Sequence, residues 1–114
     1  MDERLKSALE QSDLMVVLNQ QKRIIKEQYQ ADLVHYQNGC QFTANQELIS
    51  FCQSMIQLGQ TQSVVIDDNG IPCLIENLEN FATDLVETYA SATNGYFNKY
   101  EKLKKQRSVE GIVS

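Results

Sequence analysis

The stretch VVIDDNGIPCLIE, from Val64 to Glu76, decides the fold, because here the chain stops showing a helical pattern. Two apolar runs rich in β-branched residues flank the sequence Asp-Asn-Gly. Asn and Gly accept the positive φ angles that a tight hairpin turn requires. We therefore predict a single β-hairpin over about residues 63–75.

Side chains alternate between the two faces of a strand, so each face of this hairpin can be assigned. One face is expected to hold Val64, Ile66, Cys73 and Ile75, and the other Val65 and Leu74. Both faces are then apolar, and an isolated two-stranded hairpin is marginal in water. Helices or a partner chain should therefore cover it.

A calcium-binding loop is the alternative to a plain turn, because the stretch carries neighbouring carboxylates. Asp67 and Asn69 could supply the first and third ligands of such a loop. The fifth position is Ile71, however, and the sixth is Pro72 where a glycine is needed. The spacing favours the turn.

Helical periodicity extends on both sides of this stretch, with apolar positions three or four residues apart. The first helix is predicted over about residues 2–37, with Asn38-Gly39 ending it in the left-handed conformation. A short helix is predicted over about 44–58, capped by Thr43 and ended by Gly59.

The last helix is predicted over about residues 77–107, with Asn77 as its N-cap. Its apolar stripe continues in steps of three and four for nearly four heptads. The pair Asn94-Gly95 inside it costs about 1 kcal/mol relative to alanine, and marks either a kink or a close helix crossing.

The fold class expected from these elements is mainly α. Two long helices should pack antiparallel, with the short helix and the one hairpin at one end. A chain of 114 residues is expected to form a single helical domain over residues 1–114.

The composition of the chain limits its expected cellular location and its expected partners. No apolar run reaches the length of a membrane span, and the start MDERLKSALEQ lacks the apolar core of a signal peptide. We therefore expect a cytoplasmic protein without a membrane partner. Three cysteines without a secretion signal are expected to be reduced, and a net charge of −5 disfavours a general polyanion binder.

Metal and nucleophile chemistry would have to use the single histidine. His35, Cys40, Cys52 and Cys73 are zinc ligands by type, but no Cys-x-x-Cys pair brings two of them together locally. A His35–Cys40 nucleophile pair lacks an evident third group to orient the base. We predict no catalytic residue, cofactor or metal site, and hence no enzyme.

The acidic run between Asp67 and Glu87 could also suggest a metal or glycosidase site. Asp84 and Glu87 lie three residues apart and would share one helix face. Acidic side chains near a helix N-terminus interact favourably with the helix dipole. A solvated helix face is therefore the favoured interpretation.

The basic end of the last helix supports an alternative function. It interleaves Tyr96, Phe97 and Tyr100 with a group of cations: Lys99, Lys102, Lys104, Lys105 and Arg107. Aromatic stacking with phosphate contacts is how proteins hold single strands. Because the tyrosines belong to the apolar stripe, mainly the cations are left for an accessory role in DNA or RNA metabolism.

Two segments carry a resemblance to a known family: DERLKSALEQSDLMVVLNQQKRIIKE at residues 2–27 and ATNGYFNKYEKLKKQRSVEGIV at residues 92–113. In these the chain resembles a family of small proteins of T4-like marine bacteriophages. The resemblance implies a phage protein made in the bacterial host cytoplasm, and it brings no active site with it. The helix–hairpin–helix order also resembles a prefoldin subunit, from which the break at Gly39 and the inserted short helix depart.

The leading hypothesis is a non-enzymatic, self-associating helical protein that acts through protein contacts, in the role of a phage assembly or accessory factor. A homo-oligomer and an unidentified protein partner are expected. Six residues are the candidates for contact: Val65, Leu74, Tyr89, Tyr96, Tyr100 and Leu103. Burial in the protein's own core is the alternative role for the residues of the helix stripe.

Overall fold

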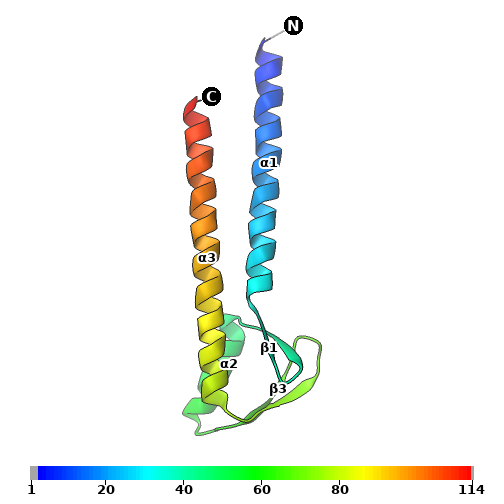
Figure 1. The fold of residues 1–114 in the computed structure, drawn as a ribbon, viewed down its shortest axis with the longest axis vertical. Helices are drawn as coiled ribbons and strands as arrows, with labels where there is room; N and C mark the ends of the chain where they lie inside the picture. Colours follow the sequence, from blue (N-terminus) through cyan, green and yellow to red (C-terminus); the bar gives the residue numbers. More distant parts are fainter. Residues whose placement is uncertain (1–2, 114) are drawn as a thin grey trace. The chain divides into compact units, whose positions relative to one another are not determined.

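The computed structural model describes the backbone of residues 3–113 and the side chains of residues 15–106. In this part of the chain, three helices and four strands follow one another (Figure 1): α1 (Glu3–Asp32), β1 (Val34–Gln37), β2 (Cys40–Thr43), α2 (Gln46–Gln57), β3 (Ser63–Ile66), β4 (Pro72–Ile75) and α3 (Leu78–Val113). The strands form two small antiparallel hairpins. The fold is therefore mixed, and the prediction of a mainly α fold with a single hairpin is wrong on this point.

The chain divides into two compact units. Residues 1–29 and 95–114 form the helical unit, and residues 30–94 form the mixed unit, which contains both hairpins and α2. That the chain folds as a single domain stays a prediction.

The first hairpin occupies the place predicted for the end of the first helix. α1 ends at Asp32, and β1 then pairs with β2 so that Gln37 lies opposite Cys40. Asn38 and Gly39 form the two-residue turn with φ angles of 53° and 74°. Positive φ at both positions is the signature of the type I′ turn, which matches the twist of the flanking strands. The expected helix stop is thus a hairpin turn.

Replacing Gly39 by alanine should lower the free energy of unfolding by about 1–2 kcal/mol, because an L side chain disfavours the left-handed region. The matched control is Gly95→Ala. A Cβ at either glycine would meet nothing within 4 Å, so only backbone conformation separates the two positions. Gly95 lies inside α3, where alanine should raise stability by about 0.5–1 kcal/mol.

Urea denaturation followed by circular dichroism measures both effects. Opposite signs are expected for the two variants. Equal or parallel changes would contradict the turn assigned to Asn38 and Gly39.

The second hairpin has a longer connection than predicted, and this sets its register. β3 and β4 pair so that Val64 lies opposite Leu74 and Val65 opposite Cys73. The connection runs over residues 67–71 instead of a two-residue turn. Because directly opposed residues share a face, Val64 and Leu74 belong together, not Val65 and Leu74.

The two faces of the second hairpin are therefore different from those predicted. The buried face holds Val65, Cys73 and Ile75. The other face is exposed and carries Val64, Ile66 and Leu74. One face is covered within the chain, as a marginal two-stranded hairpin requires, and the other is open.

The remaining helix ends follow local capping chemistry. Asn45, not Thr43, caps α2 by accepting a hydrogen bond from the amide of Leu48 at 2.8 Å, because Thr43 belongs to β2. Gly59 closes the helix with φ 86°, as predicted. Asn77 caps α3, also as predicted, by accepting from the amide of Asn80 at 3.1 Å.

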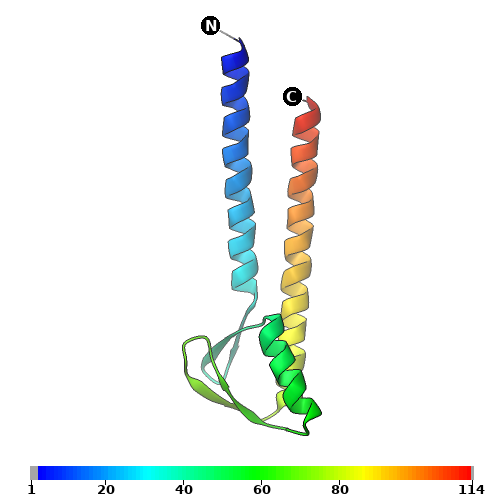
Figure 2. The same ribbon diagram turned by 180° about the vertical axis from the view of Figure 1, so that it is seen from behind.

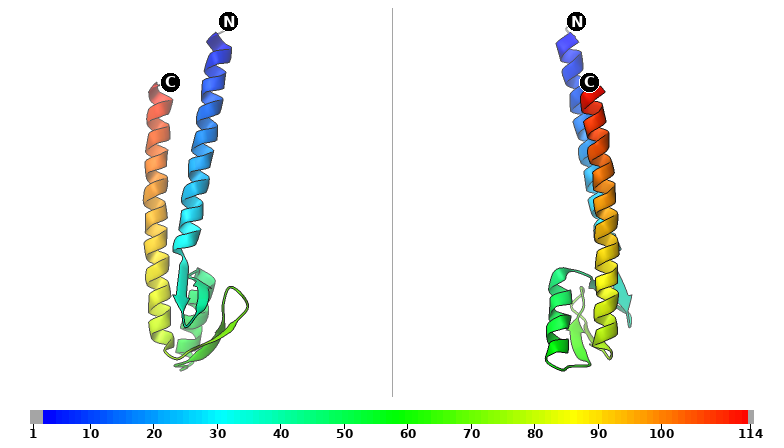
Figure 3. Two further views of the ribbon diagram at one scale, coloured as in Figure 1. Left: turned by 45° about the vertical axis from the view of Figure 1, so that its right-hand side comes forward. Right: turned by 90° about the vertical axis from the view of Figure 1, so that its left-hand side faces the viewer.

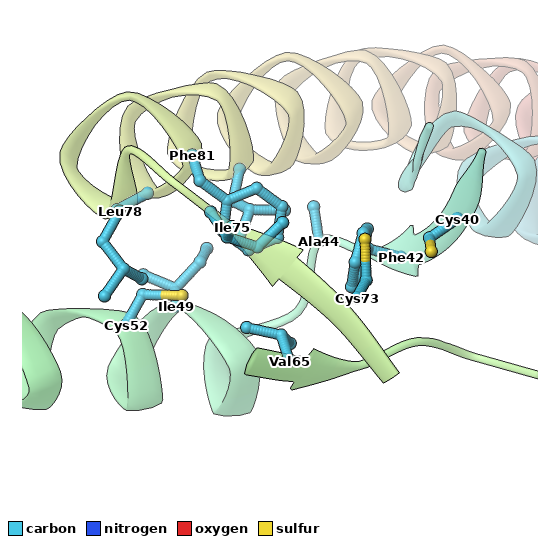
Figure 4. Packing of buried hydrophobic residues seen from close by; sticks show 12 residues of the cluster. Cys40, Phe42, Ala44, Ile49, Cys52, Val65, Cys73, Ile75, Leu78 and Phe81 are labelled. Carbon is cyan, nitrogen blue, oxygen red and sulfur yellow. The ribbon is translucent and has the colours of Figure 1, made fainter. Parts of the chain in front are cut away.

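The core of the mixed unit lies between the two hairpins, α2 and the start of α3 (Figures 2 and 4). Its buried members are Cys40, Phe42, Ala44, Ile49, Cys52, Val65, Cys73, Ile75, Leu78, Phe81, Ala82 and Leu85. Phe42 and Phe81 meet edge to face with ring centroids 5.0 Å apart. Such a pair stabilises the fold by more than its buried area alone contributes. The two rings therefore link β2 to α3.

In the helical unit, α1 and α3 lie side by side and run antiparallel (Figure 3). Tyr29 stacks on Tyr96 with ring centroids 4.6 Å apart, and the earlier residue Leu18 lies beside the later residue Leu103. This order confirms the predicted antiparallel packing for these stretches. α3 continues without a break past Gly95 to Val113, beyond the predicted end at 107, and the open space at Gly95 excludes a close crossing there.

Candidate functional site

The carboxylate of Asp67, in the connection of the second hairpin, is bound by backbone amides. Its Oδ1 accepts from the amides of Asn69 at 2.9 Å and Ile71 at 2.8 Å, and its Oδ2 accepts from Gln41 at 3.1 Å. The side chain is buried. This pattern is an Asx-type turn that widens the connection and joins it to β2.

These bonds also set the charge state of the group. Hydrogen bonds from the amides of Ile71, Gln41 and Asn69 hold the pKa of Asp67 below its ordinary value of 3.8, although burial acts in the other direction. A carboxylate that accepts several amide protons is stabilised in its ionised form. Both of its oxygens are engaged by the backbone, which disfavours a calcium loop.

The neighbouring Asp68 extends this attachment to β2. Its oxygens accept from the amide of Thr43 at 3.2 Å and from the Thr43 hydroxyl at 2.7 Å, and its own amide donates to the carbonyl of Gln41 at 2.8 Å. The connection of the second hairpin therefore occupies the outer edge of β2. The paired carboxylates singled out in the sequence act as structural hydrogen-bond acceptors.

The histidine and the cysteines do not assemble as a metal site. His35 Nε2 lies 3.0 Å from Gln37 Oε1, and its ring lies 5.9 Å from that of Phe81. Cys40 instead has Cys73 as its neighbour. Within the described residues, no three side chains of His, Cys, Asp or Glu come together.

The surface hollows of the mixed unit involve other residues. Three of them, with volumes of about 390, 510 and 460 Å³, are lined by residues of α2 and α3, their flanking segments and Asp32 at the end of α1. None of the three is lined by His35 or Cys40. A hydrolase built on that pair gains no support from these hollows.

Of the predicted contact residues in the mixed unit, only Leu74 lies on an open surface. Val65 is 4% exposed and belongs to the core. Tyr89 is half-buried against the core, and its hydroxyl accepts from Gln46 Nε2 at 2.8 Å. Sequence reasoning placed Val65 outward because it assumed the shorter connection.

The helical unit turns its predicted contact residues inward. Tyr96 and Tyr100 are half-buried, and Leu103 is buried. Other large apolar side chains of this unit are exposed instead: Met15, Val16, Val17, Ile24 and Phe97. Sequence reasoning missed this group. The spacing of Val17 and Ile24, seven residues apart, was the available signal.

The basic residues of α3 are mostly at the surface. Lys102, Lys104 and Lys105 are exposed, and Lys99 is half-buried. Lys104 Nζ lies 3.6 Å from Glu101 and 5.9 Å from the centre of the Tyr100 ring. The side chain of Arg107, the last predicted nucleic-acid contact, lies outside the described side chains.

Charge is separated along the chain. Residues 30–94 contain eight Asp and Glu residues and no Lys or Arg, so every lysine and arginine lies in the segments of the helical unit. Described cations of that unit lie on both helices, for example Lys26 and Lys102. Among the described side chains, the mixed unit is therefore acidic and the helical unit mainly basic.

No protein-family model, curated protein or solved structure matches this chain. The resemblance to a bacteriophage family accordingly stays a prediction. Among the described residues, no helix has the length and apolar character required to cross a bilayer.

Proposed function

We propose that the protein is a non-enzymatic self-associating protein, and that two copies join through their helical units. One observation carries the proposal: among its described side chains, this unit exposes more large apolar residues than it buries. Only Leu18 and Leu103 are buried there, while Met15, Val16, Val17, Ile24 and Phe97 are exposed.

The geometry of α1 places an apolar stripe away from its partner helix. Leu18, Lys22 and Tyr29 lie on the side that meets α3. At 100° per residue, Val17 and Ile24 lie within about 20° of each other on a different side of the helix. Their spacing of seven is that of a coiled-coil seam.

A second copy is the occupant that best fits this stripe. Two antiparallel helix pairs can close into a four-helix bundle, which is a common and self-complementary arrangement. Burying the exposed half of one Val17 or Ile24 side chain contributes about 1 kcal/mol per side chain. The cost of association offsets much of this gain, so the dimer should be weak and depend on concentration.

The described helical unit carries more cations than carboxylates, and this predicts the salt response. Like charges on two approaching helical units repel each other, and salt screens that repulsion. Association through the apolar stripe should therefore strengthen between low and physiological salt. A contact driven by opposite charges would weaken over the same range.

Light scattering after size-exclusion chromatography, over a range of concentrations, tests the proposal. The expected result is a mass that rises from 13.0 kDa towards a multiple of it as concentration increases. Ile24→Glu should remove this rise, since it places a charge in the stripe. A wild-type protein of 13.0 kDa at every concentration and salt would contradict self-association.

Two further variants locate the interface. Leu58→Glu changes a side chain that is 75% exposed on the mixed unit, and it should leave the mass unchanged. Val64→Glu tests the open face of the second hairpin, which is the competing contact surface. Loss of association in Val64→Glu but not in Ile24→Glu would move the interface to that hairpin.

A second candidate function is binding of single-stranded nucleic acid by α3. The favouring observation is that Lys102, Lys104 and Lys105 are exposed on one short segment. Phosphate contacts release counterions, so such binding must weaken steeply with salt.

Fluorescence anisotropy with a labelled single strand at low salt tests this candidate. The double variant Lys104→Glu, Lys105→Glu should weaken binding by roughly tenfold or more, because phosphate contacts supply most of the affinity. The double variant Arg23→Glu, Lys26→Glu makes the same charge change on α1 and should bind more nearly as the wild type does. Absence of binding at low salt would rule the candidate out.

A further inference from the structure

Two cysteines from different hairpins meet in the core of the mixed unit. Cys40 belongs to β2 and Cys73 to β4, and their side chains are 6% and 5% exposed. The Cys73 side chain acts on the Cys40 thiol as a hydrogen-bond neighbour, and Figure 4 draws the two sulfur atoms near each other. Cys52 lies at a different place in the same core, beside Ile49 and Leu78.

Hydrogen bonds hold the two hairpins together on both sides of this pair. Asn38 Nδ2 donates to the carbonyl of Leu74 at 3.3 Å, next to Cys73 in the chain. The amide of Gln41, next to Cys40, donates to Asp67 Oδ2 at 3.1 Å. These neighbouring hydrogen bonds hold the two thiols opposite each other, and this arrangement does not depend on the cysteines themselves.

We propose that Cys40 and Cys73 form a reversible disulfide that links the two hairpins, made by exchange with a low-molecular-weight disulfide such as oxidised glutathione. The site lies in the mixed unit and is independent of self-association through the helical unit. It would lock the mixed unit under oxidising conditions and release it under reducing ones.

The reaction needs no reagent other than oxidised glutathione. One cysteine loses its proton to solvent, and its thiolate attacks a sulfur of oxidised glutathione. A mixed disulfide forms and one glutathione leaves as a thiolate. The second cysteine, also deprotonated, then attacks the protein sulfur of the mixed disulfide and releases the second glutathione. The two cysteines are oxidised, one glutathione disulfide is reduced, and the two protons end on the two glutathione thiols.

Packing controls when the first step can occur. The hydrogen bond with Cys73, burial and the nearby charge of Asp67 raise the pKa of Cys40 to about 11. A thiol with so high a pKa is almost entirely protonated at neutral pH and reacts slowly. The first attack therefore requires the hairpins to separate, and the second step follows when they close again and bring the two sulfurs together.

Oxidation of the full-length Cys52→Ala variant tests the proposal, because only the proposed pair remains. The folded protein is incubated with oxidised glutathione, unfolded, alkylated and weighed. The expected product has lost two hydrogens and takes up no alkylating reagent, and reductant restores both thiols. Oxidation should raise the Tm by roughly 10 °C, since the link closes a long loop.

The wild-type protein provides a second measurement that does not depend on any variant. Digestion after Asp and Glu separates all three cysteines, so peptide mapping identifies the linked pair; a Cys40–Cys73 link is expected. Stable glutathione adducts on either residue, or a link that includes Cys52, would overturn the proposal.

Labelling kinetics check the role of packing. In folded Cys52→Ala, a thiol reagent should react roughly 100-fold more slowly than in urea, as expected for buried protonated thiols. Equal rates in the two conditions would contradict control by hairpin opening.

Discussion

Phe81→Ala is expected to lower the free energy of unfolding by about 3–5 kcal/mol, the range for removing a fully buried aromatic ring. The side chain is 0% exposed at the start of α3 and packs against Phe42 and His35. Removing it leaves a cavity where β2 meets the helix. A loss of this size is a large fraction of the stability of an ordinary domain.

Urea denaturation followed by circular dichroism measures this loss. Phe51→Ala is the matched control, because the same ring is removed from a side chain that is 43% exposed on α2. That variant should lose about 1 kcal/mol or less, as is usual for surface positions. Similar losses for the two variants would contradict the placement of the core around Phe81.

Asp67→Ala is expected to lower the Tm by roughly 10 °C, because the backbone amides of Gln41, Asn69 and Ile71 lose the buried carboxylate that accepts from them. The same change detaches the second hairpin from β2. Differential scanning calorimetry at neutral pH measures the shift. Asp84→Ala removes a carboxylate from an exposed position on α3 and should change the Tm by no more than about 2 °C.

The effect of Asp67 should depend on pH in a defined direction. Its pKa is lower in the folded protein than the ordinary value of 3.8, so the folded state binds this proton less readily than the unfolded state does. The stabilisation is therefore complete above pH 3.8 and is lost as the pH falls below it. The Tm difference between wild type and Asp67→Ala should be constant near neutrality and shrink in acid. A difference that grows in acid would show that the carboxylate is not the stabilising group.

The sequence sufficed where local chemistry and tertiary structure agree. Gly59 ends α2 and Asn77 begins α3, because each residue forms its helix end through local backbone interactions. The antiparallel packing of α1 and α3 follows from their apolar periodicity. The first hairpin was missed because Asn38-Gly39 suits either a helix stop or a type I′ turn. The strand contacts of Phe42 in the core decide between the two, and these are long-range.

The faces of the second hairpin could not be predicted for a similar reason. Its connection is long because the carboxylate of Asp67 bonds two of its amides and one from β2, 26 residues earlier. Asp-Asn-Gly alone favours a shorter turn, and a change of register by one residue turns every side chain to the other face. A contact from elsewhere in the chain thus determines whether Val64 or Val65 is at the surface.

The sequence predicted the type of the candidate surfaces but not the individual residues that form them. Apolar contact was predicted on the last helix and the hairpin, and open apolar surface does occur on α3 and on the second hairpin. The individual residues differ, with Phe97 and Val64 exposed in place of Tyr96 and Val65. The stripe on α1 was missed, because contact residues were predicted only on the hairpin and the last helix.

The separation of charge along the chain has a practical consequence for proteolysis. Trypsin cleaves after Lys and Arg, and residues 30–94 contain neither. Its nearest cleavage sites are Lys26 and Lys99, which lie on α1 and α3 beyond both ends of the mixed unit. A complete digest therefore releases this unit as a single peptide, residues 27–99, with both hairpins, all three cysteines and the whole core. The enzyme that fragments most proteins is here a means of excising one unit whole.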